Sequence, residues 1–140
     1  MSDIRIQQED FNVDEELARL RAAFPDAGGS VAFIGTTRNI SHNEAIAWID
    51  FEHYAGMAEA ELAKVRQQAL ERFDILAASI VHRVGHMPVG EQIVLVLAVA
   101  RHRKAAFEAC EYMIDTLKES VPIWKRERTD SGDVWVSATP

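Results

Sequence analysis

The pattern of hydrophobic and polar positions along the chain predicts a mixture of helices and strands. Apolar residues that recur every three to four positions predict helices near residues 13–23, 57–73 and 104–120. Alternating or β-branched apolar runs predict strands at 4–6, 31–37, 45–54, 75–84, 92–100, 123–128 and 134–137. A polar loop is expected at 39–44.

The ends of these segments carry their own signals. Asn12 or Asp14 can cap the first helix. Glycine and proline at 85–90 predict a loop between two strands that pair, and a turn at 130–132 joins the last two strands. Strands and helices do not alternate as regular β-α-β units, so we predict an α+β fold with a largely antiparallel mixed sheet and two long helices.

Two segments are expected to lie in the core. The strand at 92–100 is apolar on both faces, and with its β-rich neighbours it is also expected to supply surface for a dimer. The helix at 104–120 has an apolar stripe that predicts burial of Phe107, Cys110, Ile114, Leu117 and Val121.

Composition narrows the class of protein. The chain has 140 residues, of which 48% are hydrophobic and 26% charged, so a single domain spanning 1–140 is expected. The sequence contains no apolar run of membrane-spanning length, and its first ten residues are too polar for a signal peptide, so we expect a cytoplasmic protein without membrane contact.

The distribution of charge favours a small anionic ligand. A net charge of -7 argues against nucleic-acid binding, yet residues 101–128 hold seven basic and five acidic residues. Three basic residues and His102 form the run 101–104 between a strand and a helix, where they can bind a phosphate or simply solvate a loop.

Two further features concern catalysis. The sequence has no phosphate-binding glycine loop and no zinc-protease motif, and His82 and His86 flank a strand end, so we predict neither a metal site nor a cofactor. Helical spacing places Lys118 on or beside the buried stripe, where it either reaches outward to Asp115 or lines a partly dry pocket. Lys125 follows on an extended segment and can face the same pocket.

Several stretches, in this order and spacing, resemble the catalytic, large subunit of molybdopterin synthase over nearly the whole chain. They are Val31-Ala-Phe-Ile-Gly-Thr-Thr-Arg38-Asn39, Phe51-Glu-His-Tyr-Ala-Gly-Met57, Val81-His-Arg-Val-Gly85, Arg101-His-Arg103 with Phe107-Glu-Ala109, and Pro122-Ile-Trp-Lys-Arg-Glu127. The resemblance implies an α/β hammerhead-like fold.

The resemblance also implies an activity and partners. Members of this family are sulfurtransferases that convert cyclic pyranopterin monophosphate to molybdopterin, with sulfur from the thiocarboxylated C-terminus of a small ubiquitin-like subunit. They assemble as a heterotetramer around a homodimer of large subunits. The chemistry fits a chain with one cysteine, because the sulfur nucleophile arrives on the partner.

Site residues follow from the same resemblance. Lys118 and Lys125 match the active-site lysines. The expected substrate contacts are Arg38, His102 and Arg103, and the residues expected to line the same pocket are Thr36, Thr37, Arg126 and Glu127. The alternative is a non-enzymatic module whose basic patch binds an acidic partner tail. A phosphate-ester enzyme is a third candidate, but the sequence lacks a glycine-rich cradle for it.

Overall fold

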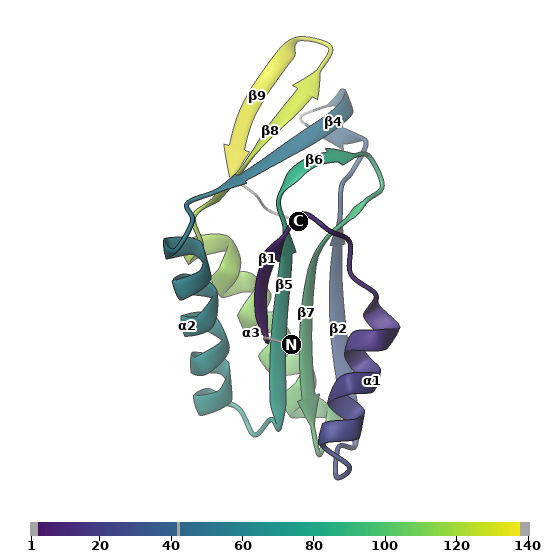
Figure 1. Cartoon of the computed structure of the whole chain (residues 1–140), viewed down its shortest axis with the longest axis vertical. Coiled ribbons are helices and arrows are strands. Elements are labelled where there is room, and N and C mark those ends of the chain that lie inside the picture. The colour runs from purple at the N-terminus through teal and green to yellow at the C-terminus, as the bar shows by residue number, and fades with distance from the viewer. Residues whose placement is uncertain (1–2, 42, 138–140) are drawn as a thin grey trace.

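The computed structural model describes residues 3–41 and 43–137, which form two sheets and three helices (Figure 1). The helices are α1 (Val13–Ala23), α2 (Met57–Arg72) and α3 (Arg103–Ser120). The strands are β1 (Ile4–Gln7), β2 (Gly29–Thr36), β3 (Ile40–Ser41), β4 (Glu44–His53), β5 (Ala77–Arg83), β6 (Gly85–Pro88), β7 (Gln92–Ala100), β8 (Ile123–Thr129) and β9 (Gly132–Ser137). The predicted α+β class is confirmed.

The larger part of the core surrounds β7. The first sheet has the order β1-β5-β7-β2, in which β1 runs parallel to β5 and the other neighbours are antiparallel. Helices α2 and α3 cover one face of this sheet, and α1 covers the other (Figure 1). Alternate residues of β7 therefore enter two separate cores, which confirms that this strand is apolar on both faces.

The same burial corrects one expectation. Every residue from 93 to 100 is at most 3% exposed, because helices cover both faces and β5 and β2 occupy both edges. The prediction that this strand supplies a dimer surface is therefore wrong. The free edge of the sheet on this side belongs to β2.

The second sheet lies at one end of the first and has the order β3-β4-β8-β9, with β6 paired to the other edge of β4 (Figure 1). The predicted turn between β8 and β9 is confirmed, and Gly132 after it has a φ of 112°. The two short strands β3 and β6 were expected to be loop. Both pair with β4. Strand β3 pairs locally with the start of β4, Ile40 with Ala45, whereas the pairing of β6 is long-range and overrides the local glycine and proline signals.

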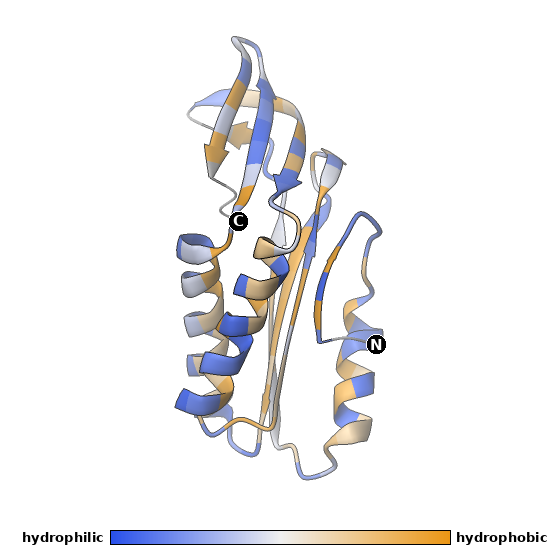
Figure 2. Ribbon diagram, turned by 60° about the vertical axis from the view of Figure 1, so that its left-hand side comes forward, coloured by the Kyte–Doolittle hydropathy of each residue, from blue (hydrophilic) through white to orange (hydrophobic). Residues whose placement is uncertain are grey.

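Helix boundaries agree with the sequence signals. The Asn12 side chain caps α1 by accepting a hydrogen bond from the Glu15 amide at 3.0 Å. The helices turn their hydrophobic residues toward the sheet (Figure 2). The predicted stripe of α3 is buried at four of its five positions, but Phe107 is 61% exposed. This part of the prediction is wrong, because the centre of the buried face lies along Ala106, Ala109 and Met113 and leaves Phe107 at its border.

Candidate functional site

A small pocket lies where the end of β2 meets the inner face of β8. Its volume of about 10 Å³ has room for about one water molecule. Five of the residues expected at the active site line it, namely Thr36, Thr37, Arg38, Lys125 and Glu127. Its other walls are Ile40, Ile46, Ile49, Phe51 and Ile93. The structure thus gathers polar side chains from two distant segments within an apolar enclosure.

The alternation of β8 brings Lys125 and Glu127 to this pocket. Successive side chains of a strand point to opposite faces, so Ile123, Lys125 and Glu127 share the inner face, as the sequence predicts. The Lys125 Nζ lies 3.4 Å from the Glu127 Oε2, and both side chains are largely buried. A lysine and a carboxylate removed from water together form a fixed pair of charges in the pocket.

The β2 end of the pocket supplies hydroxyls and a cation. The Thr37 hydroxyl donates to the Pro88 carbonyl at 2.9 Å and accepts from the Glu91 amide at 3.0 Å, so it fastens β2 to the β6–β7 turn. Thr36 and Arg38 are exposed. Within the described part of the chain the Arg38 guanidinium forms no ion pair, and it is free to bind an anion at the mouth of the pocket.

Arg126 lies on the opposite face of β8. Its guanidinium donates to the Asp50 Oδ2 at 3.0 Å and lies over the Trp135 ring, 5.5 Å from its centroid. Burial opposes ionisation of Asp50, but hydrogen bonds from His86 and Arg126 outweigh it and hold the pKa of this carboxyl below its ordinary value. The hydrogen bond to Asp50 likewise raises the pKa of Arg126. The structure does not bring Arg126 to the pocket.

Lys118 lies in the last turn of α3, and β8 begins soon after that helix ends. Its side chain is exposed, and the described residues include no ion pair between Lys118 and Asp115. Of the two interpretations of this lysine, the outward-pointing one therefore holds in the single chain, without the carboxylate partner. Lys118 is an unpaired cation at the end of the molecule that contains the pocket.

His102 and Arg103 lie at the other end of α3. His102 is the N-cap residue, although its side chain makes no capping hydrogen bond, and both side chains are exposed. Their neighbour Arg101 is paired with Asp26 at 3.0 Å. Arg103 precedes Lys118 by 15 residues, which separates them by about 22 Å along the helix. One chain therefore does not bring these two groups of predicted site residues together.

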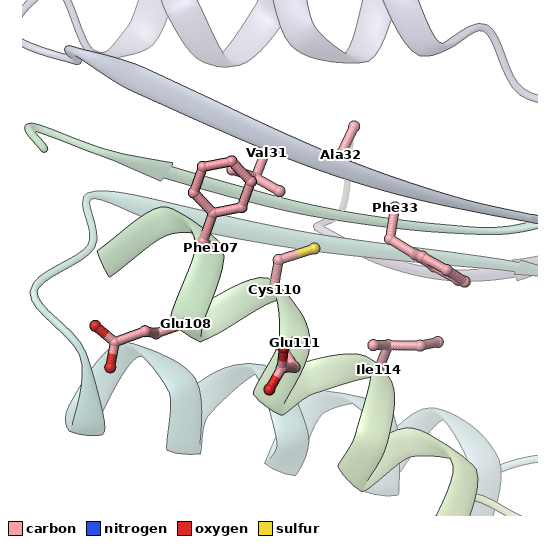
Figure 3. Close-up of a pocket in the computed structure, with 8 residues that line it drawn as sticks. All are labelled: Val31, Ala32, Phe33, Phe107, Glu108, Cys110, Glu111 and Ile114. Atoms are coloured by element: carbon pink, nitrogen blue, oxygen red, sulfur yellow. The ribbon is translucent and has the colours of Figure 1, made fainter. Parts of the chain in front are cut away.

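A second, larger hollow lies between β2 and α3. This groove has a volume of about 460 Å³ and is lined by Val31, Ala32, Phe33, Phe107, Glu108, Cys110, Glu111 and Ile114. Phe107, Cys110 and Ile114 turn toward β2, whereas Glu108 and Glu111 point away at the rim (Figure 3). The groove could not be predicted from the sequence, because an apolar helical stripe does not reveal that the strand beneath the helix is a sheet edge.

The cysteine and the histidines of β5 and β6 do not belong to either hollow as reactive groups. Cys110 is 4% exposed, and burial raises the pKa of its thiol to about 11, so the thiol stays protonated at neutral pH. His82 is fully buried on β5, while His86 lies on β6 and is exposed. Among residues 3–41 and 43–137, no cluster of three His, Cys, Asp or Glu side chains is arranged to hold a metal ion. No helix in these ranges is long and apolar enough to span a membrane.

Comparisons with known proteins identify the family. The sequence model described as MoaE protein matches residues 6–120. The molybdopterin synthase catalytic subunit of Ralstonia nicotianae is 43% identical over 138 residues, which cover 99% of this chain and 78% of the relative. The structure of the molybdopterin biosynthesis MoaE protein from Burkholderia ambifaria is 42% identical with a TM-score of 0.85, and the match covers 100% of this chain and 92% of that one.

A more distant structure shares the fold. It is the complex of subunits 1 and 2 of molybdopterin-converting factor from Helicobacter pylori, with 21% identity, a TM-score of 0.78, and coverage of 98% of this chain and 92% of that one. The sequence model matches residues 6–120, and the relatives named above match most of each protein. The chain therefore belongs to the MoaE family, the catalytic subunits of the enzyme molybdopterin synthase.

Proposed function

We propose that this catalytic subunit transfers sulfur from the thiocarboxylated C-terminal glycine of a small ubiquitin-like partner to cyclic pyranopterin monophosphate. The proposal rests on the small pocket between β2 and β8. Its polar lining consists of Thr36, Thr37, Arg38 and Lys125, together with the buried carboxylate of Glu127. Cations suit a substrate with a phosphate and a reaction that passes through oxyanions.

The chain needs an external source of sulfur. Cys110 is its single cysteine, and that thiol is buried and protonated. In each transfer the partner's thiocarboxylate sulfur forms a bond to a side-chain carbon of the pterin, and a carbon–oxygen bond at that carbon breaks, so that the oxygen leaves as the phosphate or as water. A water molecule then attacks the acyl carbon of the resulting thioester, the bond between that carbon and sulfur breaks, the sulfur stays on the pterin, and the partner leaves as a carboxylate. Two such transfers supply the two sulfur atoms of the dithiolene, so two partner molecules are consumed.

The roles of the site residues follow from their charges. Arg38, His102 and Arg103 bind the substrate phosphate and pterin, and Lys118 and Lys125 stabilise the oxyanions and exchange protons. Thr36, Thr37 and Glu127 shape the pocket. Arg126 acts at most indirectly, from the outer face of β8 where it is bound to Asp50. The catalytic work of this subunit is thus charge stabilisation around a nucleophile that the partner supplies.

A second copy of the chain completes the site. Arg103 and Lys118 are about 22 Å apart along α3 in one chain, too far for one pterin-sized ligand to contact both. The midpoint between them falls at Cys110 and Glu111, which line the groove. An antiparallel α3 of a second copy, seated across this groove, therefore brings its own His102 and Arg103 to Lys118.

The charge pattern of α3 supports this pairing. The first turn of the helix is basic, with Arg103 and Lys104, and the later turns carry Asp115 and Glu119. Antiparallel packing brings the basic turn of each copy beside the acidic turns of the other. The exposed Phe107 and the free edge of β2 provide the apolar surface for the contact.

The partner is recognised chiefly through its tail. The structural relative from Helicobacter pylori is a complex of two subunits of the converting factor, which supports a two-subunit assembly here. The test combines this chain, the pterin and the thiocarboxylated partner, and measures sulfur incorporation by mass spectrometry. Product with two sulfur atoms is expected, and a partner that lacks its last few residues should give none. A stable complex without sulfur incorporation would instead support the non-enzymatic interaction module.

A further inference from the structure

Glu127 is the most deeply buried charged group in the pocket. It is 1% exposed and lies on the inner face of β8, opposite Ile49 of β4. The walls around it include Ile46, Phe51 and Ile93. A carboxylate that loses its water in apolar surroundings is strongly destabilised unless a cation or hydrogen-bond donor compensates it.

Only one of the two carboxylate oxygens of Glu127 has a partner among the described residues. The Oε2 atom is paired with the Lys125 Nζ at 3.4 Å. The Oε1 atom is buried, and no donor among the described residues reaches it. A carboxylate kept only for stability would have both oxygens satisfied, and unsatisfied buried polar atoms are rare in folded proteins. The placement of Glu127 is therefore better explained by what it does to Lys125.

Lys125 depends on this single contact. Its side chain is 12% exposed, and Glu127 provides the one ion pair it makes within the described part of the chain. A lysine has a long flexible stem, so without a partner its ammonium would turn toward water at the mouth of the pocket. The carboxylate holds the ammonium inside the pocket that Thr36 and Arg38 also line.

We propose that Glu127 is a positioning residue, which holds the Lys125 amino group in the pocket and contributes to catalysis through that lysine. The inference rests on the proposed function, since it assigns a role within the same site. A lysine held at a fixed place in the pocket can stabilise the negative charge that develops on the reacting groups.

A double-mutant cycle tests the proposal on the assembled synthase. Glu127→Gln keeps the side-chain volume and removes the charge, and we expect kcat to fall about 10- to 100-fold with KM values within about threefold. Lys125→Ala should lower kcat by at least as much. In the Lys125→Ala background, Glu127→Gln should change kcat by less than about threefold, because the residue through which Glu127 acts is gone.

Stability supplies an independent readout. Lys125→Ala leaves Glu127 as an uncompensated buried charge, so its melting temperature should fall below that of the wild type. Adding Glu127→Gln to that variant should raise the melting temperature again, because the stranded charge disappears. Glu127→Asp retains the charge on a shorter side chain and should give a kcat between those of the wild type and Glu127→Gln. It remains informative if Glu127→Gln folds poorly.

The matched control is the Glu61–Lys64 pair on the surface of α2, with a similar separation of 3.5 Å. Glu61→Gln should leave kcat unchanged. An unchanged kcat in Glu127→Gln, or kcat losses that multiply in the double variant, would overturn the positioning role. Absence of sulfur transfer by the wild-type chain would overturn the proposed function instead. In that case the melting temperatures still test the pair. If the variant with both Lys125→Ala and Glu127→Gln melts no higher than Lys125→Ala alone, Lys125 does not compensate the buried charge of Glu127.

Discussion

Lys118 and Lys125 are separated by seven residues in sequence, yet their surroundings differ. Lys125 is enclosed and paired with Glu127, whereas Lys118 is exposed and carries no partner in the described part of the chain. The difference predicts different consequences for stability when each is removed. An exposed unpaired lysine contributes little to folding, while a buried paired one compensates a charge.

We expect Lys118→Ala to reduce sulfur transfer by about 100-fold or more, because it removes a cation that acts in the transition state. The melting temperature should stay close to that of the wild type, since the side chain is exposed and forms no ion pair with the described residues. Turnover and thermal unfolding measure the two effects, with Lys64→Ala on α2 as the surface control. Near-normal turnover in Lys118→Ala would remove this lysine from the site.

Arg103 and Arg38 should affect substrate affinity more than folding. Both guanidinium groups are exposed and free of ion pairs within the described residues, so they can bind a phosphate. Replacing either by alanine should weaken binding of the pterin by about tenfold or more, since a hydrogen bond to a charged group contributes about 1.5–3 kcal/mol. Isothermal titration with the pterin measures this affinity. Unchanged affinity in both variants would place the phosphate elsewhere.

His82 predicts a loss of stability in mild acid. Its Nδ1–H donates to the Arg83 carbonyl at 2.7 Å, and complete burial lowers the pKa of the imidazole to about 4. A histidine in the unfolded chain has a pKa near 6.5. As the pH falls, His82 therefore binds a proton in the unfolded state before it does so in the folded state, and this proton binding favours unfolding. The contribution of neutral His82 to the free energy of unfolding is therefore present above about pH 6.5 and is lost progressively below it.

The expected loss is about 2 kcal/mol between pH 7 and pH 5. Urea unfolding at both values measures it, and His82→Gln should show a smaller difference because glutamine does not titrate. Asp10 and Asp50 have lowered pKa values in the folded chain, and their contributions are lost only near pH 4 and below. An equal pH dependence in wild type and His82→Gln would refute the assignment to this histidine.

At the scale of elements, local periodicity predicted the long helices and the core strands correctly. The run at 92–100 is apolar at every position that faces either core, and this is visible in the sequence. Strand β3 was missed because its two residues are too few to show an alternating pattern. Strand β6 was missed because its pairing with β4 depends on residues far away in the chain. The exposure of Phe107 was missed for the same reason, since the edge position of β2 is a property of the sheet.

The groove between α3 and β2 gives a prediction for assembly. Phe107→Arg places a charge in the proposed contact between two copies, so it should shift the chain from dimer to monomer at micromolar concentration and reduce turnover. Light scattering measures the mass. The melting temperature should change little when compared as monomers, because Phe107 is 61% exposed in the single chain. A Phe107→Arg protein that stays dimeric would show that the copies meet elsewhere.

At the scale of the whole molecule, five of the nine predicted site residues meet at one pocket, and Lys118 lies at the same end of the chain. Those five come from the end of β2, the two residues after it, and β8. The residue pattern singled out Lys125, but the family resemblance was needed to place all five in one site, because residue patterns alone do not show that these segments meet. His102 and Arg103 belong to the opposite end of α3. Sequence could not reveal this division, since it depends on the length and direction of one helix.

Subunit complementation tests the shared site. In a homodimer of the Lys118→Ala variant, both sites of the dimer are damaged. The same holds for a homodimer of the Arg103→Ala variant. In a mixed dimer both substitutions fall in the same site, and the other site is intact. Mixing the two impaired proteins under exchange conditions, with the pterin well below its KM, should therefore restore about a quarter of the wild-type turnover. No recovery, with mixed dimers confirmed by mass spectrometry, would mean that each chain builds its site alone.

The alternation of side chains along β8 limits how this family member can diverge in length. Lys125 and Glu127 face the pocket while Arg126 faces outward, solely because side chains alternate along β8. Insertion or deletion of one residue between the end of α3 and Lys125 would exchange the two faces and present Arg126 to the pocket. Substitutions in that connection are therefore tolerated more readily than changes of its length. Engineering by loop grafting should use the turn at 130–131, which follows Lys125 and Glu127, because a change of length there leaves the facing of β8 intact.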